Sequence, residues 1–188
     1  VQQFPLRAAL GCLPPGTTAI RHVVAGGHVA EGDRLATVWP VPARPAEAAD
    51  NWHTTDDGGA WTMQEPFGAY SWYPVNDQPS DKALYDFTIT VASPWTGVAN
   101  GTMTSRKEVD GNTVTSFHLA EPAASYLITI GIGDYQMRRD TTARGVPLNY
   151  WALRSQKGAF GDLRYAKQAI EWLEAKLGPY PFSSAGIL

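Results

Sequence analysis

The chain has 188 residues, of which 44% are hydrophobic and 11% aromatic, and these proportions are typical of one or two globular domains with a substantial core. Its 15 basic and 18 acidic residues give a formal net charge of −3 and are spread along the chain, which argues against nucleic acid and acidic membrane surfaces as partners. The single cysteine, Cys12, excludes an internal disulfide bond and a zinc site made of four cysteines.

The first part of the chain is predicted to form short strands separated by turns rich in Gly, Pro and Asp. The segments with strand character are Leu6–Leu10, Ile20–Val24 and Leu35–Val38. Pro40 and Pro42 then oppose regular strand pairing, and Ala46–Asp50 is compatible with a helical turn. No apolar run reaches the ~20 residues of a membrane helix, and no signal peptide is recognisable. We therefore expect a soluble chain, whose cellular location the sequence leaves unknown.

The clearest strand signal lies in the middle of the chain, where Tyr85, Phe87, Ile89 and Val91 alternate with polar residues. Such a strand covers a core with one face. Further on, Asp110-Gly111 between two strand-like segments predicts a hairpin, and hence antiparallel pairing.

Three later segments are also read as strands. The alternation of apolar residues through Tyr126–Ile132 predicts a central strand, and further strands are expected near Tyr135–Arg139 and Pro147–Leu153.

The pattern changes after Ser155, where apolar residues recur at helical spacing. The residues that carry this spacing are Leu163, Ala166, Ile170, Leu173 and Leu177. Asp162 is a predicted N-cap, and Gly178-Pro179 should end the helix, which is expected over about residues 162–177. A run of strands followed by one helix predicts a β domain over residues 1–154 joined to the incomplete beginning of a second domain, residues 155–188.

The sequence contains none of the common metal-binding, nucleophile or phosphate-binding motifs. The four histidines are widely spaced and include no His-x-x-x-His or His-Glu-x-x-His pair, so no metal site and no bound cofactor is expected in this chain. His118 is interpreted as a hydrogen-bonded or solvent-facing residue of a strand. No nucleophile elbow or phosphate-binding loop occurs either, so no catalytic residue is assigned.

Glu65 and its aromatic neighbours are the candidate binding residues. Glu65 precedes Pro66, which disfavours helix at Glu65 and predicts that its carboxylate projects from extended chain or a loop. An exposed loop carboxylate without function is the default interpretation of such a glutamate. The aromatic residues near this loop are Trp52, Trp61, Trp72 and Tyr73, for which core packing is favoured over an exposed binding surface.

Residues Thr62–Tyr85 resemble a segment of the aminopeptidase N family of zinc metallopeptidases. That family shows Gln-x-Glu-Ala, then Phe-Asp-Glu-Pro and Lys-Ala, and Glu65 precedes Pro79 by the expected spacing, with Asp77-Gln78-Pro79 and Lys82-Ala83 in the later positions. The likeness continues through Ala99-Asn100-Gly101 and Pro122–Leu127. It extends through Gly131–Tyr135 to Leu173–Phe182, which looks like the first catalytic-domain helix ending in Gly-Pro-Tyr-Pro-Phe.

The resemblance implies a mainly β fold: a saddle-like antiparallel sheet or sandwich, followed by one helix that begins a thermolysin-like catalytic domain missing from the chain. It further implies that Glu65 binds the protonated α-amine of a peptide substrate, and that zinc belongs to a longer parent protein that carries the His-Glu-x-x-His motif. Tyr70 and Trp72 are possible neighbours of that site. Met63, Ser71 and Val75 depart from the family pattern, so subsite preference is not carried over.

Two hypotheses follow from these observations. The chain is the N-terminal, substrate-anchoring part of a zinc aminopeptidase, inactive by itself, whose partners are a peptide substrate and its own catalytic domain. Alternatively, it is a non-catalytic β-sheet binding or scaffolding module, either an inactive relative or an aromatic carbohydrate or peptide binder. A His-Glu-x-x-His motif in the parent sequence distinguishes the two.

Overall fold

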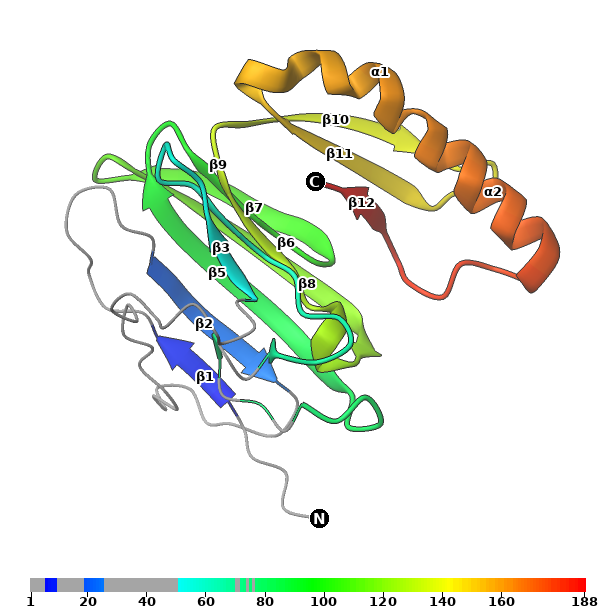
Figure 1. The fold of residues 1–188 in the computed structure, drawn as a ribbon, viewed down its shortest axis with the longest axis horizontal. Coiled ribbons are helices and arrows are strands. Elements are labelled where there is room, and N and C mark those ends of the chain that lie inside the picture. The colour runs from blue at the N-terminus through cyan, green and yellow to red at the C-terminus, as the bar shows by residue number, and fades with distance from the viewer. Residues whose placement is uncertain (1–5, 10–18, 26–50, 70–71, 74, 76) are drawn as a thin grey trace. The chain divides into compact units, whose positions relative to one another are not determined.

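The computed structural model describes residues 6–9, 19–25, 51–69, 72–73, 75 and 77–188 (Figure 1). The chain divides into two compact units, Val1–Gly133 and Asp134–Leu188. It is mainly β, with antiparallel sheets and a helix near its C-terminal end, which confirms the predicted fold class. The strand expected at Leu35–Val38 and the helical turn expected at Ala46–Asp50 lie outside the described residues, as does Cys12.

The first unit contains a sheet of five strands in which all neighbours are antiparallel. Its order is β1 (Leu6–Ala9), β2 (Ala19–Ala25), β5 (Ala83–Ala92), β8 (Asn112–Ala123) and β7 (Thr102–Val109). The predicted strand is β5, and its apolar residues Tyr85, Phe87, Ile89 and Val91 are all buried. Asp110 and Gly111 both have positive φ and join β7 to β8, which confirms the predicted hairpin.

A second sheet of four strands lies in the same unit (Figure 1). Its order is β3 (Trp52–Thr54), β4 (Ala60–Thr62), β9 (Ile130–Gly133) and β6 (Thr96–Ala99). Strand β6 packs closely on β5, because a Cβ atom at Gly97 would lie 2.1 Å from the side chain of Ile89. The hydroxyl of Thr115 also donates to the Gly97 carbonyl at 2.7 Å, so the buried faces of the two sheets meet there.

The prediction of one continuous strand over Tyr126–Ile132 is partly wrong. Ser125–Leu127 forms the 3-10 helix η2, and strand β9 begins only at Ile130, between β4 and β6. Side chains rather than a neighbouring strand satisfy the intervening backbone: Asn100 Nδ2 donates to the Leu127 carbonyl at 3.0 Å, and Asn100 Oδ1 accepts from the Thr129 N–H at 2.6 Å. Ile128 is buried although it lies outside any strand, which explains why the sequence shows the apolar alternation of a strand here.

The second unit combines a three-stranded sheet with a helical segment (Figure 1). Its elements are β10 (Tyr135–Thr141), β11 (Pro147–Leu153), η3 (Arg154–Ala159), α1 (Phe160–Leu163), α2 (Tyr165–Leu177) and β12 (Ala185–Ile187). Strand β11 pairs antiparallel with β10 and parallel with β12. Leu148 and Tyr150 of β11 form a small core with Phe160, against which Leu163 and Ile170 pack. The two strands predicted in this region are therefore confirmed.

The predicted terminal helix is present, but it starts differently. Asp162 lies inside α1 and makes no capping hydrogen bond, because the chain enters α2 from another helical turn and Arg164, itself helical, occupies the N-cap position. Gly178 ends α2 with a φ of 101°, and its N–H bonds to the Glu174 carbonyl at 3.2 Å, as expected. Across the described part of the chain, no helix is long and apolar enough to cross a membrane.

The division between the compact units does not test the predicted domain limits. Strands β10 and β11 belong to the second unit with the helix, whereas the sequence places them in the β domain. The domains expected over residues 1–154 and 155–188 therefore stay a prediction.

Candidate functional site

Glu65 lies in the loop that follows β4, in bent rather than helical chain, and its side chain is exposed. The peptide bond between Glu65 and Pro66 is cis. The predicted loop position of this carboxylate is thus confirmed, while its role in binding substrate stays a prediction. Two exposed apolar residues flank it in the sequence, Met63 with 62% and Phe67 with 58% of its surface accessible. Glu65 therefore combines a carboxylate with apolar neighbours along the same loop.

The residue before Glu65, Gln64, is almost completely buried, with 1% of its surface accessible. Its Nε2 atom donates to the carbonyl of Ile128 and lies 3.4 Å from the carbonyl of Tyr126. Its Oε1 atom accepts a hydrogen bond from Trp72 Nε1 at 3.3 Å. A buried amide needs such partners, since an unpaired polar group is costly away from water. These bonds tie the start of the loop to the segment around η2.

Asp77 closes the other end of the same loop. Its Oδ2 atom accepts the Gly68 N–H at 2.7 Å, and its Oδ1 atom accepts the Ser125 hydroxyl at 2.7 Å. Its backbone has a φ of 43°, in the left-handed region that Asp tolerates better than most residues. Its bond to Gly68 joins residues nine positions apart, so Asp77 connects the two ends of the loop.

The aromatic residues near the loop separate into two groups. Trp72 lies 4.3 Å from Tyr73 and 6.2 Å from Trp52, measured between ring centroids, and both Trp72 and Tyr73 are buried. Trp61 stacks instead on His53 at 4.0 Å. The hydroxyl of Tyr73 lies 3.5 Å from that of Tyr85, and burial raises the pKa of each of these two hydroxyls. Core packing, the interpretation favoured from the sequence, is confirmed for Trp72 and Tyr73.

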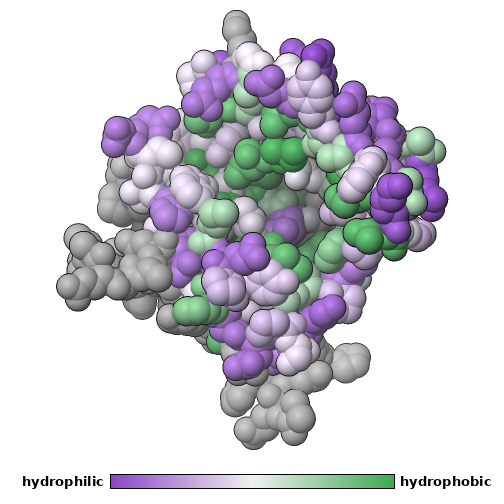
Figure 2. Space-filling model, turned by 45° about the vertical axis from the view of Figure 1, so that its right-hand side comes forward, coloured by the Kyte–Doolittle hydropathy of each residue, from purple (hydrophilic) through white to green (hydrophobic). Residues whose placement is uncertain are grey.

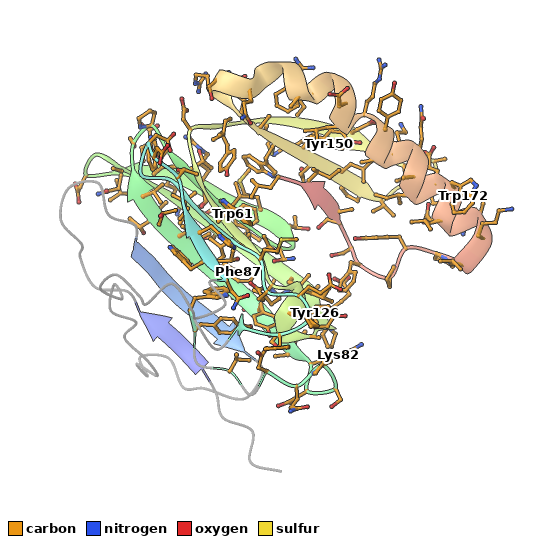
Figure 3. The ribbon with its side chains drawn as sticks, viewed as in Figure 1. Trp61, Lys82, Phe87, Tyr126, Tyr150 and Trp172 are labelled. Carbon is orange, nitrogen blue, oxygen red and sulfur yellow. The ribbon has the colours of Figure 1, made fainter. Side chains whose placement is uncertain are left out.

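Tyr70, Ser71 and Pro74 lie outside the described residues. Later in the family-like segment, Gln78, Pro79 and Lys82 are exposed. Figure 3 labels Lys82 just before β5 and Tyr126 in η2. On the face drawn in Figure 2, hydrophobic and hydrophilic residues lie side by side at the surface.

Metal binding finds no support in the part of the chain that the structure describes. There, no group of three or more His, Cys, Asp and Glu side chains could hold a metal ion, so these residues do not fit a zinc site. His118 lies on β8, where its Nδ1 is 2.6 Å from Asp86 Oδ1 of β5 and both side chains are exposed. The interpretation of His118 as a hydrogen-bonded or solvent-facing strand residue is therefore confirmed.

Three buried polar residues that anchor the loop by hydrogen bonds were not predicted from the sequence. Gln64, Ser125 and Asn51 are buried polar residues, and their partners lie far away in the sequence or on the backbone. Neither Gln64 nor Asn51 is marked as buried by its neighbours, since Glu65 follows Gln64 and Asp50 precedes Asn51, whereas Ser125 stands between Ala124 and Tyr126.

Comparison with known proteins finds a family model that matches the part of the chain containing this loop. Residues 50–127 match the peptidase M1 N-terminal domain. Aminopeptidase A of Gloydius brevicauda is 28% identical over 98 residues, which are 52% of this chain and 10% of that protein. Tricorn protease-interacting factor F2 of Thermoplasma acidophilum is 28% identical over 128 residues, 67% of this chain and 16% of that protein. The chain therefore spans a small fraction of the length of these relatives.

A solved structure supports the same fold. The M1 zinc metallopeptidase from Deinococcus radiodurans matches with a TM-score of 0.64 and 23% identity, over 78% of this chain and 33% of that chain. At this identity the likeness establishes the fold alone. The resemblance stated from the sequence is confirmed by these findings.

Proposed function

We propose that the chain is the substrate-anchoring part of a zinc-dependent aminopeptidase, because residues 50–127 match the peptidase M1 N-terminal domain. In this proposal Glu65 binds the protonated α-amine of a peptide, and a larger protein supplies the remaining catalytic groups. The part of this chain in the reaction is then recognition of the substrate.

The observation that carries the proposal is the placement of Glu65. Its carboxylate is exposed, but the residues on both sides of it, Gln64 and Gly68, are buried and hydrogen-bonded to distant parts of the chain. A carboxylate on an anchored loop can hold a cation at a defined position, which a carboxylate on a freely moving loop cannot do.

The chemistry of the loop suits an ammonium group attached to an apolar side chain. Glu65 supplies the negative charge, and the exposed side chains of Met63 and Phe67 supply apolar surface along the loop. Attraction between opposite charges about 4 Å apart rises several-fold when water is displaced, as happens when a ligand covers the site. Because a peptide carries an α-ammonium group only at its free N-terminus, a site that binds this group favours removal of one residue at a time from that end.

The experiment that tests this function uses the full-length protein containing this chain and aminoacyl-amide substrates. Wild type is compared with Glu65→Gln and with the control Asp56→Asn, which neutralises an exposed acid in the turn between β3 and β4. Activity should disappear with a zinc chelator and return on adding zinc. Glu65→Gln should raise KM by about 10- to 100-fold, the range expected for losing a charge-assisted hydrogen bond, while Asp56→Asn should not.

Two other outcomes would change the conclusion in different ways. Chelator-sensitive activity with an unchanged KM in Glu65→Gln would keep the enzyme and remove the amine-binding role. A folded, zinc-loaded protein without aminopeptidase activity would instead favour a non-catalytic binding or scaffolding module.

A further inference from the structure

Asp77 connects two segments that are far apart in the sequence. Its two carboxylate oxygens each accept one hydrogen bond at 2.7 Å, from the Gly68 N–H in the Glu65 loop and from the Ser125 hydroxyl of η2. Ser125 is buried, so its hydroxyl has no free access to water as an alternative partner. An ionised carboxylate suits this position because it accepts at both oxygens, whereas an amide would turn an NH2 group toward one of the two donors.

Gly68 has little room to move away from Asp77. Its φ is 125°, and a Cβ atom at this position would lie 2.0 Å from the side-chain amide of Asn51. Asn51 is itself buried, and its carbonyl accepts the Met63 N–H at 3.0 Å. The backbone of Gly68 is therefore packed against Asn51 while its N–H bonds to Asp77, so the loop is fixed three residues after Glu65.

The contacts of Gln64 lead to the same place. Its side chain bonds to the carbonyl of Ile128 and lies within 3.5 Å of the carbonyl of Ser125. Ser125 is also the residue whose hydroxyl bonds to Asp77. Glu65 thus stands between two anchor points, Gln64 and Gly68, and both of them are tied to the segment Ser125–Ile128.

We propose that Asp77 is a positioning residue for Glu65, acting through Gly68 and Ser125 on the loop that carries the carboxylate. This inference rests on the proposed function, because positioning matters only if Glu65 binds the substrate amine. Asp77 itself does not touch substrate in this proposal. Its loss should weaken binding of a free N-terminus, because a shift of about 1 Å in a binding group is enough to lower activity strongly.

The test measures KM and kcat of the full-length protein on an aminoacyl-amide substrate. Asp77→Asn keeps the size of the side chain but removes one of its two acceptors, and we expect a rise in KM of about tenfold with a smaller change in kcat. Asp56→Asn is the matched control and should leave KM unchanged. Urea denaturation of each variant establishes that the folded protein is being compared.

A double variant separates positioning from general damage. If Asp77 acts through Glu65, adding Asp77→Asn to Glu65→Gln should raise KM no further, because the amine contact has already been lost. Multiplicative effects in the double variant would overturn the inference, as would a KM for Asp77→Asn equal to that of the control. If Glu65→Gln alone leaves KM unchanged, the proposed function fails first, and that result is distinct from either of these.

A milder variant keeps the inference testable if Asp77→Asn does not fold. Ser125→Ala removes only the bond to Oδ1 and leaves the bond from Gly68, so it should raise KM by about two- to fivefold and again have no effect in the Glu65→Gln background. Loss of folding in both variants would overturn the inference, because these bonds would then serve the stability of the unit rather than the position of Glu65.

Discussion

The β5 strand and the α2 helix both carry a regular apolar pattern, but only β5 buries all of it. Tyr85, Phe87, Ile89 and Val91 of β5 have at most 2% of their surface accessible. In α2 the same kind of pattern is split, since Ile170 packs on the strands of its unit, whereas Leu173 and Leu177 are exposed. A strand within a sheet has neighbours along its whole length, whereas a helix is covered only where it crosses the sheet.

The largest effect is expected in the well-covered region, where Phe87→Ala should destabilise the first unit by about 3–5 kcal/mol. Phe87 is buried in β5 and its ring lies 5.9 Å from the ring of Tyr85 in a nearly parallel arrangement (Figure 3). Removing the ring leaves a cavity that the two sheets cannot easily close. Urea denaturation of the 188-residue chain measures the loss.

The control for Phe87→Ala is Leu84→Ala in the same strand. Leu84 has 44% of its surface accessible, so its truncation should cost less than about 1 kcal/mol. Equal losses for the two variants would show that burial along β5 is not what stabilises this unit.

Close packing between the sheets gives the second prediction. Gly97→Ala adds one methyl group that would lie 2.1 Å from Ile89 Cγ2, so we expect a loss of about 1–3 kcal/mol. Gly161→Ala in α1 is the matched change, because a Cβ atom there has no neighbour within 4 Å. It should be neutral or slightly stabilising, as alanine favours helix over glycine. Thermal unfolding of both variants makes the comparison, and a neutral Gly97→Ala would contradict contact between β5 and β6.

Features of the fold that depend on neighbouring residues could be predicted from the sequence, whereas features that depend on residues far apart in the chain could not. The alternation in β5 and the Asp110-Gly111 turn are local signals, and both were sufficient to place a strand and a hairpin. The strand predicted over Tyr126–Ile132 was partly wrong because Asn100, a distant residue, satisfies the backbone there. Apolar periodicity predicts which side chains are buried, but it does not predict which groups form hydrogen bonds with the backbone N–H and C=O groups.

In the candidate site, too, local features could be predicted from the sequence and long-range contacts could not. The loop position of Glu65 is predicted by Pro66, which follows it directly. Gln64 and Ser125 were missed, because nothing local marks which distant carbonyl or carboxylate will meet them. The family resemblance identified the loop as a whole, while the hydrogen bonds that hold it required the fold.

The exposed end of α2 gives the third prediction, which concerns association more than stability. Leu177 has 81% of its surface accessible, and Trp172 projects from the same helix with 62% accessible (Figure 3). Leu177→Lys should change the free energy of unfolding by no more than about 0.5 kcal/mol, because the side chain is exposed and a cation suits the last helical turn. It should also reduce any concentration-dependent association of the chain.

Sedimentation velocity over a range of concentrations measures that association. Lys176→Leu, which enlarges the apolar surface at the neighbouring position, is the opposite change and should increase self-association. If the wild-type chain stays monomeric at every concentration, the exposed apolar end of α2 has no effect on association.

The smallest effects are expected from two aspartates, the exposed Asp57 in the first unit and the half-buried Asp140 in the second. Hydrogen bonds from the Thr55 hydroxyl and the Gly59 N–H lower the pKa of Asp57, and bonds from the Thr141 N–H and Lys167 lower the pKa of Asp140. A lowered folded-state pKa means that each contribution to stability is complete above the unfolded value of about 3.9 and is lost as pH falls through the folded value. Asp57→Asn and Asp140→Asn should each reduce the loss of stability in acid.

Added salt should change the stability contributions of Asp57 and Asp140 to different extents. The partners of Asp57 are neutral groups, whereas Lys167 Nζ lies 3.0 Å from Asp140 Oδ1, and a solvent-accessible ion pair of this kind is screened at high ionic strength. In urea denaturation above pH about 5, where both carboxyls are ionised, added sodium chloride should shrink the effect of Asp140→Asn more than that of Asp57→Asn. Equal salt sensitivity would mean that the Thr141 N–H, and not Lys167, accounts for the contribution of Asp140.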